Sequence, residues 1–221
     1  MTLTNSATGL HAGQPIFTTG TPLADASAVM ILVHGRGGNA ADILSLADHL
    51  QAPGLAYVAP QAAQYTWYPQ SFLAELNQNE PYLSSALDTI RTTVDQVLSL
   101  GIPTEKLILG GFSQGACLTS EFVARNANSY GGLLAFSGGL IGPPNTPREY
   151  EGRLDDMPIF LGCSNVDFHI PEARVRESAD VFEKMGAQVN LQIYPNMGHT
   201  IIADEIVQAQ LVVQAVVGDD Q

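Results

Sequence analysis

The sequence predicts an α/β fold in which a mainly parallel central sheet carries helices on both of its faces. Two observations support this class. Short apolar segments of strand character alternate along the chain with longer segments of helical period. Most of the short segments are apolar without interruption, which is typical of strands buried on both faces. The 221 residues suit one domain over 1–221, with 1–15 expected as a flexible tail.

Six segments are expected to form the strands of this sheet. Five are apolar runs, at about 29–33, 55–58, 106–110, 133–136 and 158–162, and a sixth at 189–193 alternates apolar with polar residues, as a strand nearer the edge does. Ligands of such sheets bind beyond the carboxyl ends of the strands. Functional residues are therefore expected in the loops that directly follow strands.

Five helices are expected between the strands. Asn39 is a suitable N-cap for the first helix, whose apolar face holds Ile43, Leu44, Ala47 and Leu50. The other four span about 81–100, 114–126, 171–184 and 202–217. Gly101 ends the second helix and Gly186 ends the fourth.

The composition argues against several classes of function. The formal net charge is −13, and the 9 lysines and arginines form no basic stripe for nucleic acid or for docking on anionic membranes. The longest apolar runs are too short to span a bilayer, so no stable membrane association is expected. No cluster of His, Cys and carboxylates has metal-ligand spacing, so neither a metal nor an organic cofactor is expected.

The two cysteines and the N-terminus favour a cytoplasmic protein. Cys117 and Cys163 lie among apolar residues, which predicts two buried free thiols in a reducing compartment. Residues 1–13 lack the basic and apolar regions of a signal peptide. The acidic balance is typical of a solvated surface, and adaptation to high salt is the alternative explanation. The protein is expected to be a monomer or a homodimer.

Ser113 is the candidate nucleophile. It lies in Gly111-Phe112-Ser113-Gln114-Gly115, after a predicted strand and at the start of a predicted helix. A sharp strand-to-helix turn exposes such a serine, and the flanking glycines let neighbouring segments approach closely. The helix N-terminus favours the negative charge that develops during acyl transfer. A purely structural glycine-rich turn is the alternative interpretation.

A serine hydroxyl is a weak nucleophile and needs a base. His199 follows the strand at 189–193 and lies late in the chain, as the order serine, acid, histidine requires. Asp167, in the loop after the strand at 158–162, is the candidate acid that orients the imidazole. The histidines that fit the role of base less well are His11, His34, His49 and His169.

Two preorganised N–H groups are needed to hold the oxyanion of an acyl-transfer intermediate. One is expected to be the backbone N–H of Gln114, directly after the nucleophile. The other is expected from the loop 34–38, His-Gly-Arg-Gly-Gly, with Arg36 as first choice and Gly37 as its rival. A phosphate-binding loop is the alternative function of such glycines, but this loop lacks the lysine and hydroxyl that phosphate binding requires.

Taken together, these residues resemble the phospholipase/carboxylesterase family of small α/β hydrolases. The matching motifs are His34-Gly35-x-Gly37, Gly111-Phe112-Ser113-Gln114-Gly115, Asp167 followed by Ile170-Pro171, and Gly198-His199, in order over about 28–215. The resemblance implies an α/β-hydrolase fold without a large lid domain. It also implies hydrolysis of carboxylic esters and, in some members, of thioesters or lysophospholipids.

Two departures from the family pattern bear on the substrate. Members that act on long acyl chains often carry an acidic residue after the glycine-rich loop, where this chain has Gly38 and Asn39. The family's Trp-aromatic pair corresponds to Trp67 and Tyr68, but the surrounding residues differ. Related dienelactone hydrolases use a cysteine nucleophile, and Ser113 argues against their activity.

The predicted function is that of a serine carboxylesterase, which acts on small-molecule esters of short to medium acyl chain through an acyl-enzyme. The alternatives are a thioesterase or lysophospholipase of the same family and, from another class, a non-catalytic binding protein on this fold. The residues expected to line the substrate pocket are Trp67, Tyr68 and Phe72 after the strand at 55–58, Leu140 and Ile141 in the loop 137–157, and His169.

Overall fold

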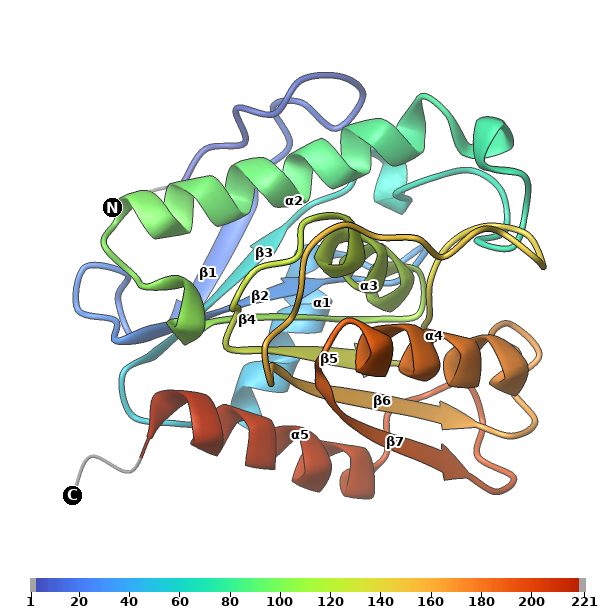
Figure 1. The fold of residues 1–221 in the computed structure, drawn as a ribbon. Coiled ribbons are helices and arrows are strands. Elements are labelled where there is room, and N and C mark those ends of the chain that lie inside the picture. Colours follow the sequence, from blue (N-terminus) through green and yellow to red (C-terminus); the bar gives the residue numbers. More distant parts are fainter. Residues whose placement is uncertain (1–2, 219–221) are drawn as a thin grey trace.

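The computed structural model describes residues 3–218, which form the α/β-hydrolase architecture that the sequence predicts (Figure 1). One seven-stranded sheet has the order β1-β3-β2-β4-β5-β6-β7. Its strands are β1 (Ile16–Gly20), β2 (Ala28–Val33), β3 (Leu55–Pro60), β4 (Leu107–Phe112), β5 (Gly132–Phe136), β6 (Pro158–Ser164) and β7 (Gln188–Tyr194). β1 runs antiparallel to β3, and every other neighbouring pair is parallel.

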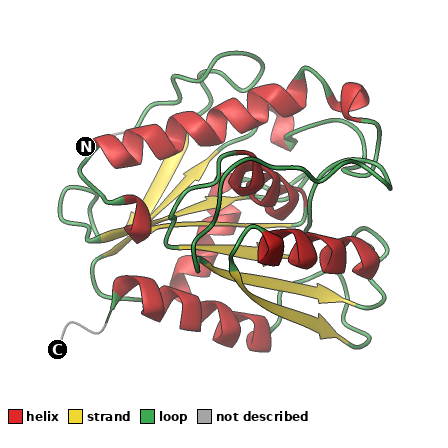
Figure 2. Cartoon of the chain, viewed as in Figure 1, coloured by secondary structure: helices red, strands yellow, loops and turns green. Residues whose placement is uncertain are grey.

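Helices cover both faces of this sheet, as Figure 2 shows. α2, α3 and α4 pack on one face, whereas α1 and α5 pack on the other (Figure 1). Their bounds are α1 (Ala40–Ile43), α2 (Tyr82–Ser99), α3 (Gln114–Arg125), α4 (Glu172–Lys184) and α5 (Ala203–Val217). The sheet therefore has a hydrophobic core on each side. The helices leave the ends of the strands uncovered, and a site can form there.

Successive residues of β2 divide between these two cores. Val29 and Ile31 belong to the core under α2, α3 and α4, whereas Met30 and Leu32 belong to the core under α1 and α5. All four side chains are fully buried. Because side chains alternate across a strand, a strand that is covered on both faces must be apolar at every position. This requirement explains the uninterrupted apolar runs in the sequence.

Two elements differ from the prediction. β1 was not expected, because its sequence Ile-Phe-Thr-Thr-Gly is mostly exposed at the sheet edge and makes no apolar run. The first helix is short: the side chain of Asn39 accepts the N–H of Asp42 at 2.9 Å, as a cap does, but α1 gives way at once to the 3₁₀ turn η1 (Leu44–Asp48).

The segment 1–15, expected as a flexible tail, packs against the domain from residue 3 onward, and residues 1–2 lie outside the described part. His11 is fully buried, with its Nε2 donating to the carbonyl of Trp67 at 2.9 Å and its Nδ1 accepting the N–H of Ala63 at 3.1 Å. Burial lowers the pKa of His11, so the ring is neutral in these contacts. The segment is held because Leu3 and Ala7 are also buried.

Candidate active site

Ser113 lies in the turn between β4 and α3, in a backbone conformation that L-residues rarely adopt (φ 55°, ψ −118°). The turn is held because the Ser113 N–H donates to the carbonyl of Phe136 at 2.9 Å. Glycine is required beside it: a Cβ on Gly115 would lie 2.0 Å from the carbonyl oxygen of Val33. The sharp turn therefore presents the Ser113 hydroxyl at the carboxyl edge of the sheet.

Ser113, His199 and Asp167 form one hydrogen-bonded chain. His199 Nε2 lies 2.8 Å from Ser113 Oγ, and His199 Nδ1 lies 2.6 Å from Asp167 Oδ2. The other carboxylate oxygen, Oδ1, accepts the backbone N–H groups of His169 at 2.8 Å and Ile170 at 3.0 Å. The three side chains come from the loops after β4, β6 and β7, whose carboxyl ends lie on the same side of the parallel sheet.

The environment of Asp167 keeps its carboxylate charged. Burial raises the pKa of Asp167, but the hydrogen bonds from His199 and from the amides of His169 and Ile170 outweigh it and hold that pKa below its ordinary value. The ionised carboxylate favours the tautomer with a proton on His199 Nδ1, in which Nε2 is an acceptor that faces the Ser113 hydroxyl. The rings of Phe112 and His169 flank the imidazole at centroid distances of 4.9 and 4.8 Å.

The loop 34–38 and the start of α3 offer backbone N–H groups beside Ser113. The N–H of Gly37 donates to the carbonyl of Tyr65 at 2.8 Å and is therefore engaged elsewhere. Within residues 3–218, the N–H of Arg36 donates to no protein acceptor. Gln114 is the first residue of α3, where an N–H has no partner inside the helix. This geometry favours Arg36 over Gly37 as the partner of Gln114.

Side chains lock these N–H groups in place. The guanidinium of Arg36 donates to the carbonyls of Pro69 at 2.9 Å and Gln70 at 2.6 Å. The Gln114 amide accepts the N–H of Trp67 at 2.9 Å and donates to the carbonyl of Tyr68 at 2.8 Å. The sequence predicted a role only for the backbone N–H groups of Arg36 and Gln114. Their side chains add the preorganisation on which an oxyanion site depends.

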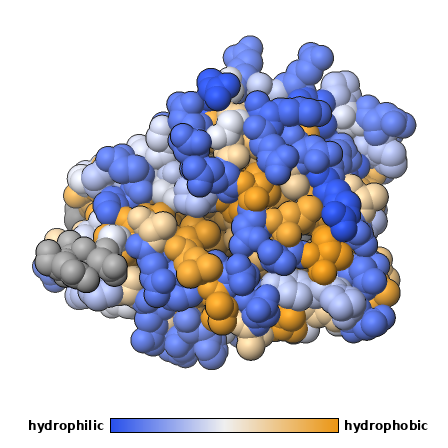
Figure 3. All heavy atoms as spheres, turned by 60° about the horizontal axis from the view of Figure 1, so that its bottom comes forward, coloured by the Kyte–Doolittle hydropathy of each residue, from blue (hydrophilic) through white to orange (hydrophobic). Residues whose placement is uncertain are grey.

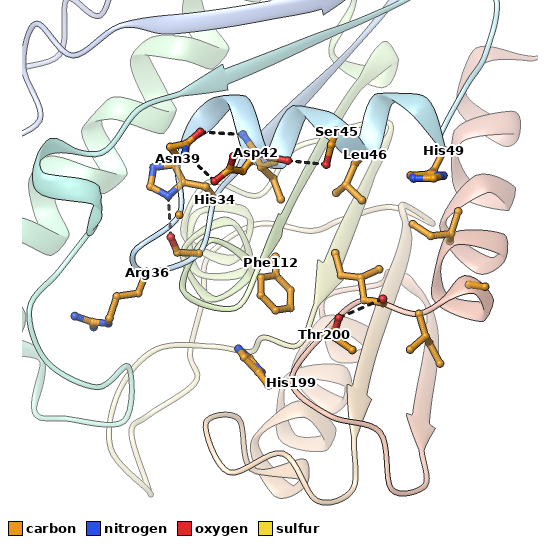
Figure 4. A pocket seen from close by; sticks show the side chains of 17 residues that line it. His34, Arg36, Asn39, Asp42, Ser45, Leu46, His49, Phe112, His199 and Thr200 are labelled. Atoms are coloured by element: carbon orange, nitrogen blue, oxygen red, sulfur yellow. Dashed lines mark hydrogen bonds between the residues drawn. The ribbon is translucent and has the colours of Figure 1, made fainter.

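Two grooves meet at His199 and Phe112. One, of about 700 Å³, runs between α1–η1 and the start of α5 (Figure 4). The other, of about 540 Å³, contains Ser113 and Gln114 and extends past Tyr68. The space-filling view in Figure 3 shows hydrophobic residues gathered along a hollow on the face that α5 borders. A molecule bound at Ser113 therefore has room to extend in two directions.

The predicted pocket residues divide into two sets. Tyr68, Phe72 and His169 line the groove that contains Ser113. Trp67, Leu140 and Ile141 line neither groove, which corrects the prediction for these three. They are almost completely buried. Trp67 donates its indole N–H to the carbonyl of His34 at 2.9 Å and supports the loop from behind.

The groove along α5 was missed by sequence reasoning. Its apolar lining is Ile43, Leu46, Phe112, Ile201, Ile202, Ala203 and Ile206. The only signal in the sequence is that two isoleucines follow His199 closely. Ala203 and Ile206 belong to α5 itself, whereas Phe112 ends β4 and Ile43 and Leu46 lie in α1 and η1. No local pattern relates these earlier segments to α5.

Residues 3–218 hold neither a metal-ligand cluster nor a helix that could span a membrane. No group of three or more His, Cys, Asp or Glu side chains within residues 3–218 is arranged to hold a metal ion. Among the helices of the same residues, none is long and apolar enough to cross a membrane. Cys117 and Cys163 are both buried and unpaired.

Comparison with known proteins identifies similar chains. The family model for phospholipases/carboxylesterases matches residues 16–217. A phospholipase/carboxylesterase crystal structure from Dyadobacter fermentans is 43% identical, with a TM-score of 0.89 over 94% of this chain and 99% of that one. The acyl-protein thioesterase 1 of Eremothecium gossypii is 27% identical over 80% of this chain and 82% of its own length. That of Debaryomyces hansenii is 26% identical over 61% of this chain and 59% of its own length.

Proposed function

The chain belongs to the phospholipase/carboxylesterase family of hydrolases, and on that basis we propose that it is a serine carboxylesterase. The observation that carries the proposal is the hydrogen-bonded chain from Ser113 through His199 to Asp167. Its substrates are carboxylic esters of short to medium acyl chain, and Ser113 carries the acyl group as a covalent intermediate.

The reaction follows from this geometry. His199 Nε2 takes the proton of Ser113 Oγ as the hydroxyl attacks the ester carbonyl carbon. The N–H groups of Gln114 and Arg36 stabilise the oxyanion. The alcohol leaves with the proton from His199, and a water that His199 deprotonates then hydrolyses the acyl-enzyme. Asp167 stabilises the imidazolium that forms in each step.

The lining of the groove that contains Ser113 favours the proposal that the acyl groups are short to medium in length. Its lining mixes the rings of Tyr68 and Phe72 with the polar Gln70 and Ser71. A long alkyl chain would have to lie against those polar groups without hydrogen-bonding them, which costs free energy. A short acyl group needs only the part of the groove nearest Ser113.

A thioesterase is the second candidate function. The observation in its favour is the similarity to acyl-protein thioesterases over most of the chain. The same triad and oxyanion donors serve both reactions, because an ester and a thioester pass through the same kind of acyl-enzyme. Oxygen and sulfur esters of the same acyl group separate the two: comparison of kcat/KM for ethyl butanoate and S-ethyl thiobutanoate measures the preference.

The nucleophile is tested with p-nitrophenyl butanoate and with a fluorophosphonate probe. Ser113→Ala is expected to lower kcat by about 10⁴-fold or more and to abolish labelling. Ser120→Ala, in the same α3, is the matched control, because the Ser120 hydroxyl is buried and has no partner among residues 3–218. Equal rates for wild type and Ser113→Ala would refute the assignment of the nucleophile.

A further inference from the structure

The two grooves have different relations to the reacting groups. They share Gly35, Arg36, Phe112 and His199. Only the smaller groove is also lined by Ser113 and Gln114. The larger groove, called the α5 groove below, touches His199 and continues along Thr200 and Ile201 to the start of α5. It therefore borders the base but not the nucleophile.

This difference indicates which groove takes the acyl group of an ester and which takes its alcohol. The acyl carbon stays bonded to Ser113 Oγ after the alcohol has left, so the acyl group belongs in the groove that Ser113 lines. The leaving oxygen receives its proton from His199 Nε2, which lies 2.8 Å from Ser113 Oγ. His199 borders both grooves, and the acyl group takes the one that Ser113 lines, so the α5 groove is the one left for the alcohol.

The lining of the α5 groove suits an apolar group. Ile43, Leu46, Ile201 and Ile206 contribute aliphatic side chains from both of its sides, and the ring of Phe112 lies between them (Figure 4). Burial of one methylene group against such a surface is worth about 0.8 kcal/mol, or about fourfold in a rate that depends on binding. An alcohol that reaches into this groove gains from each carbon it buries there.

The charges of the α5 groove disfavour an anionic alcohol. The carboxylate of Asp42 belongs to the lining. Arg36 is the only lysine or arginine in that lining, and its guanidinium points away toward the carbonyls of Pro69 and Gln70. A phosphate or carboxylate on the alcohol would thus meet a like charge without a cation to balance it.

We propose that the α5 groove binds the leaving alcohol of the substrate and selects uncharged, apolar alcohols. This inference rests on the proposed esterase function and deepens it. It makes the enzyme selective on the alcohol side through residues such as Ile43, Leu46 and Ile206, which do not line the groove of the acyl group.

The test varies the alcohol while the acyl group stays constant. The probes are ethyl, butyl and hexyl butanoate and the butanoyl ester of 6-hydroxyhexanoate, which carries a negative charge. kcat/KM covers the steps up to release of the alcohol and therefore reports its binding. We expect a two- to fourfold rise in kcat/KM per methylene from ethyl to hexyl, about the range that full or partial burial provides. We expect the charged ester to react at least about tenfold more slowly than the hexyl ester.

Ala203→Phe fills the α5 groove from an exposed position at the start of α5. It is expected to reduce the ratio of kcat/KM for hexyl over ethyl butanoate at least about tenfold. Val207→Phe is the matched control, because Val207 is 56% exposed on the same helix and does not line the groove. The control is expected to keep the wild-type ratio.

The outcomes separate this inference from the proposed function. If ethyl butanoate is hydrolysed but kcat/KM does not change with the alcohol, the assignment of the α5 groove is wrong and the esterase stands. If Ala203→Phe changes the dependence on acyl length instead, the two grooves have been assigned the wrong way round. If no ester is hydrolysed and the fluorophosphonate does not label Ser113, the proposed function itself fails.

Discussion

Glu205 makes the stability of this protein depend on pH. It lies in the first turn of α5 and is fully buried. Its Oε2 accepts the N–H of Ile202 at 3.0 Å, whereas Oε1 is buried without a partner among residues 3–218. Burial, together with the charge of the adjacent Asp204, raises the pKa of Glu205 from 4.5 to about 7, against the opposing effect of the Ile202 hydrogen bond.

The raised pKa sets both the sign and the size of the effect. The unfolded chain loses the Glu205 proton near pH 4.5, whereas the folded protein keeps it until about pH 7. Stability therefore falls as pH rises through this interval and changes no further above it. The full difference corresponds to about 3 kcal/mol, of which about 2.5 kcal/mol falls between pH 5 and 8.

Glu205→Gln removes the titration and keeps an oxygen to accept the Ile202 N–H. The free energy of unfolding is measured by urea denaturation at pH 5 and pH 8 for both proteins. The free energy of unfolding of Glu205→Gln minus that of wild type is expected to increase by about 2.5 kcal/mol from pH 5 to pH 8. Other titrating groups are common to both proteins and cancel in this comparison.

Glu183→Gln, at an exposed position in α4, is the control for the loss of one negative charge. Its difference from wild type is expected to be the same at both pH values. If the difference between Glu205→Gln and wild type were also unchanged from pH 5 to pH 8, the argument from burial of this carboxyl would be refuted.

Three further predictions concern the site and its supports. Asp167→Asn is expected to lower kcat by about 10⁴-fold, because the histidine loses the partner that fixes its tautomer, and urea unfolding should show that the protein still folds. Gly115→Ala is expected to reduce the free energy of unfolding by at least about 3 kcal/mol, because the added Cβ would meet the Val33 carbonyl oxygen at 2.0 Å; thermal denaturation measures the loss. Burial raises the pKa of the Cys117 and Cys163 thiols to about 12, so neither should react with iodoacetamide at pH 8 in the native protein, and mass spectrometry of the alkylated protein would reveal any exception.

The hydrophobic pattern of short segments was enough to predict most of the strands and helices. Six of the seven strands leave an apolar or alternating trace in the sequence, because helices cover the faces of the sheet that they form. β1 leaves no such trace, since it is exposed and is held by hydrogen bonds to β3. The candidate residues Ser113, Asp167 and His199 were selected by the glycine-flanked serine turn, by the chain order serine, acid, histidine, and by the rule that parallel strands bring their carboxyl ends together.

The tertiary structure decided everything that depends on contacts between distant segments. Trp67 and Leu140 have the composition of a pocket wall, yet both lie buried behind the grooves because other segments cover them. The tail around His11 is ordered by backbone groups more than 50 residues away. Arg36 is favoured over Gly37 as an oxyanion donor only because Tyr65 engages the Gly37 N–H.

The sequence by itself therefore determined the order of six strands and five helices along the chain, the serine turn and the candidate acid and base, because periodicity and turn chemistry are properties of short segments. The tertiary structure alone decided which side chains face solvent, which backbone N–H groups remain free and where the α5 groove opens. Those features arise where segments far apart in the chain pack together, and a hydrophobic residue has the same identity whether it lines a groove or fills the core behind it.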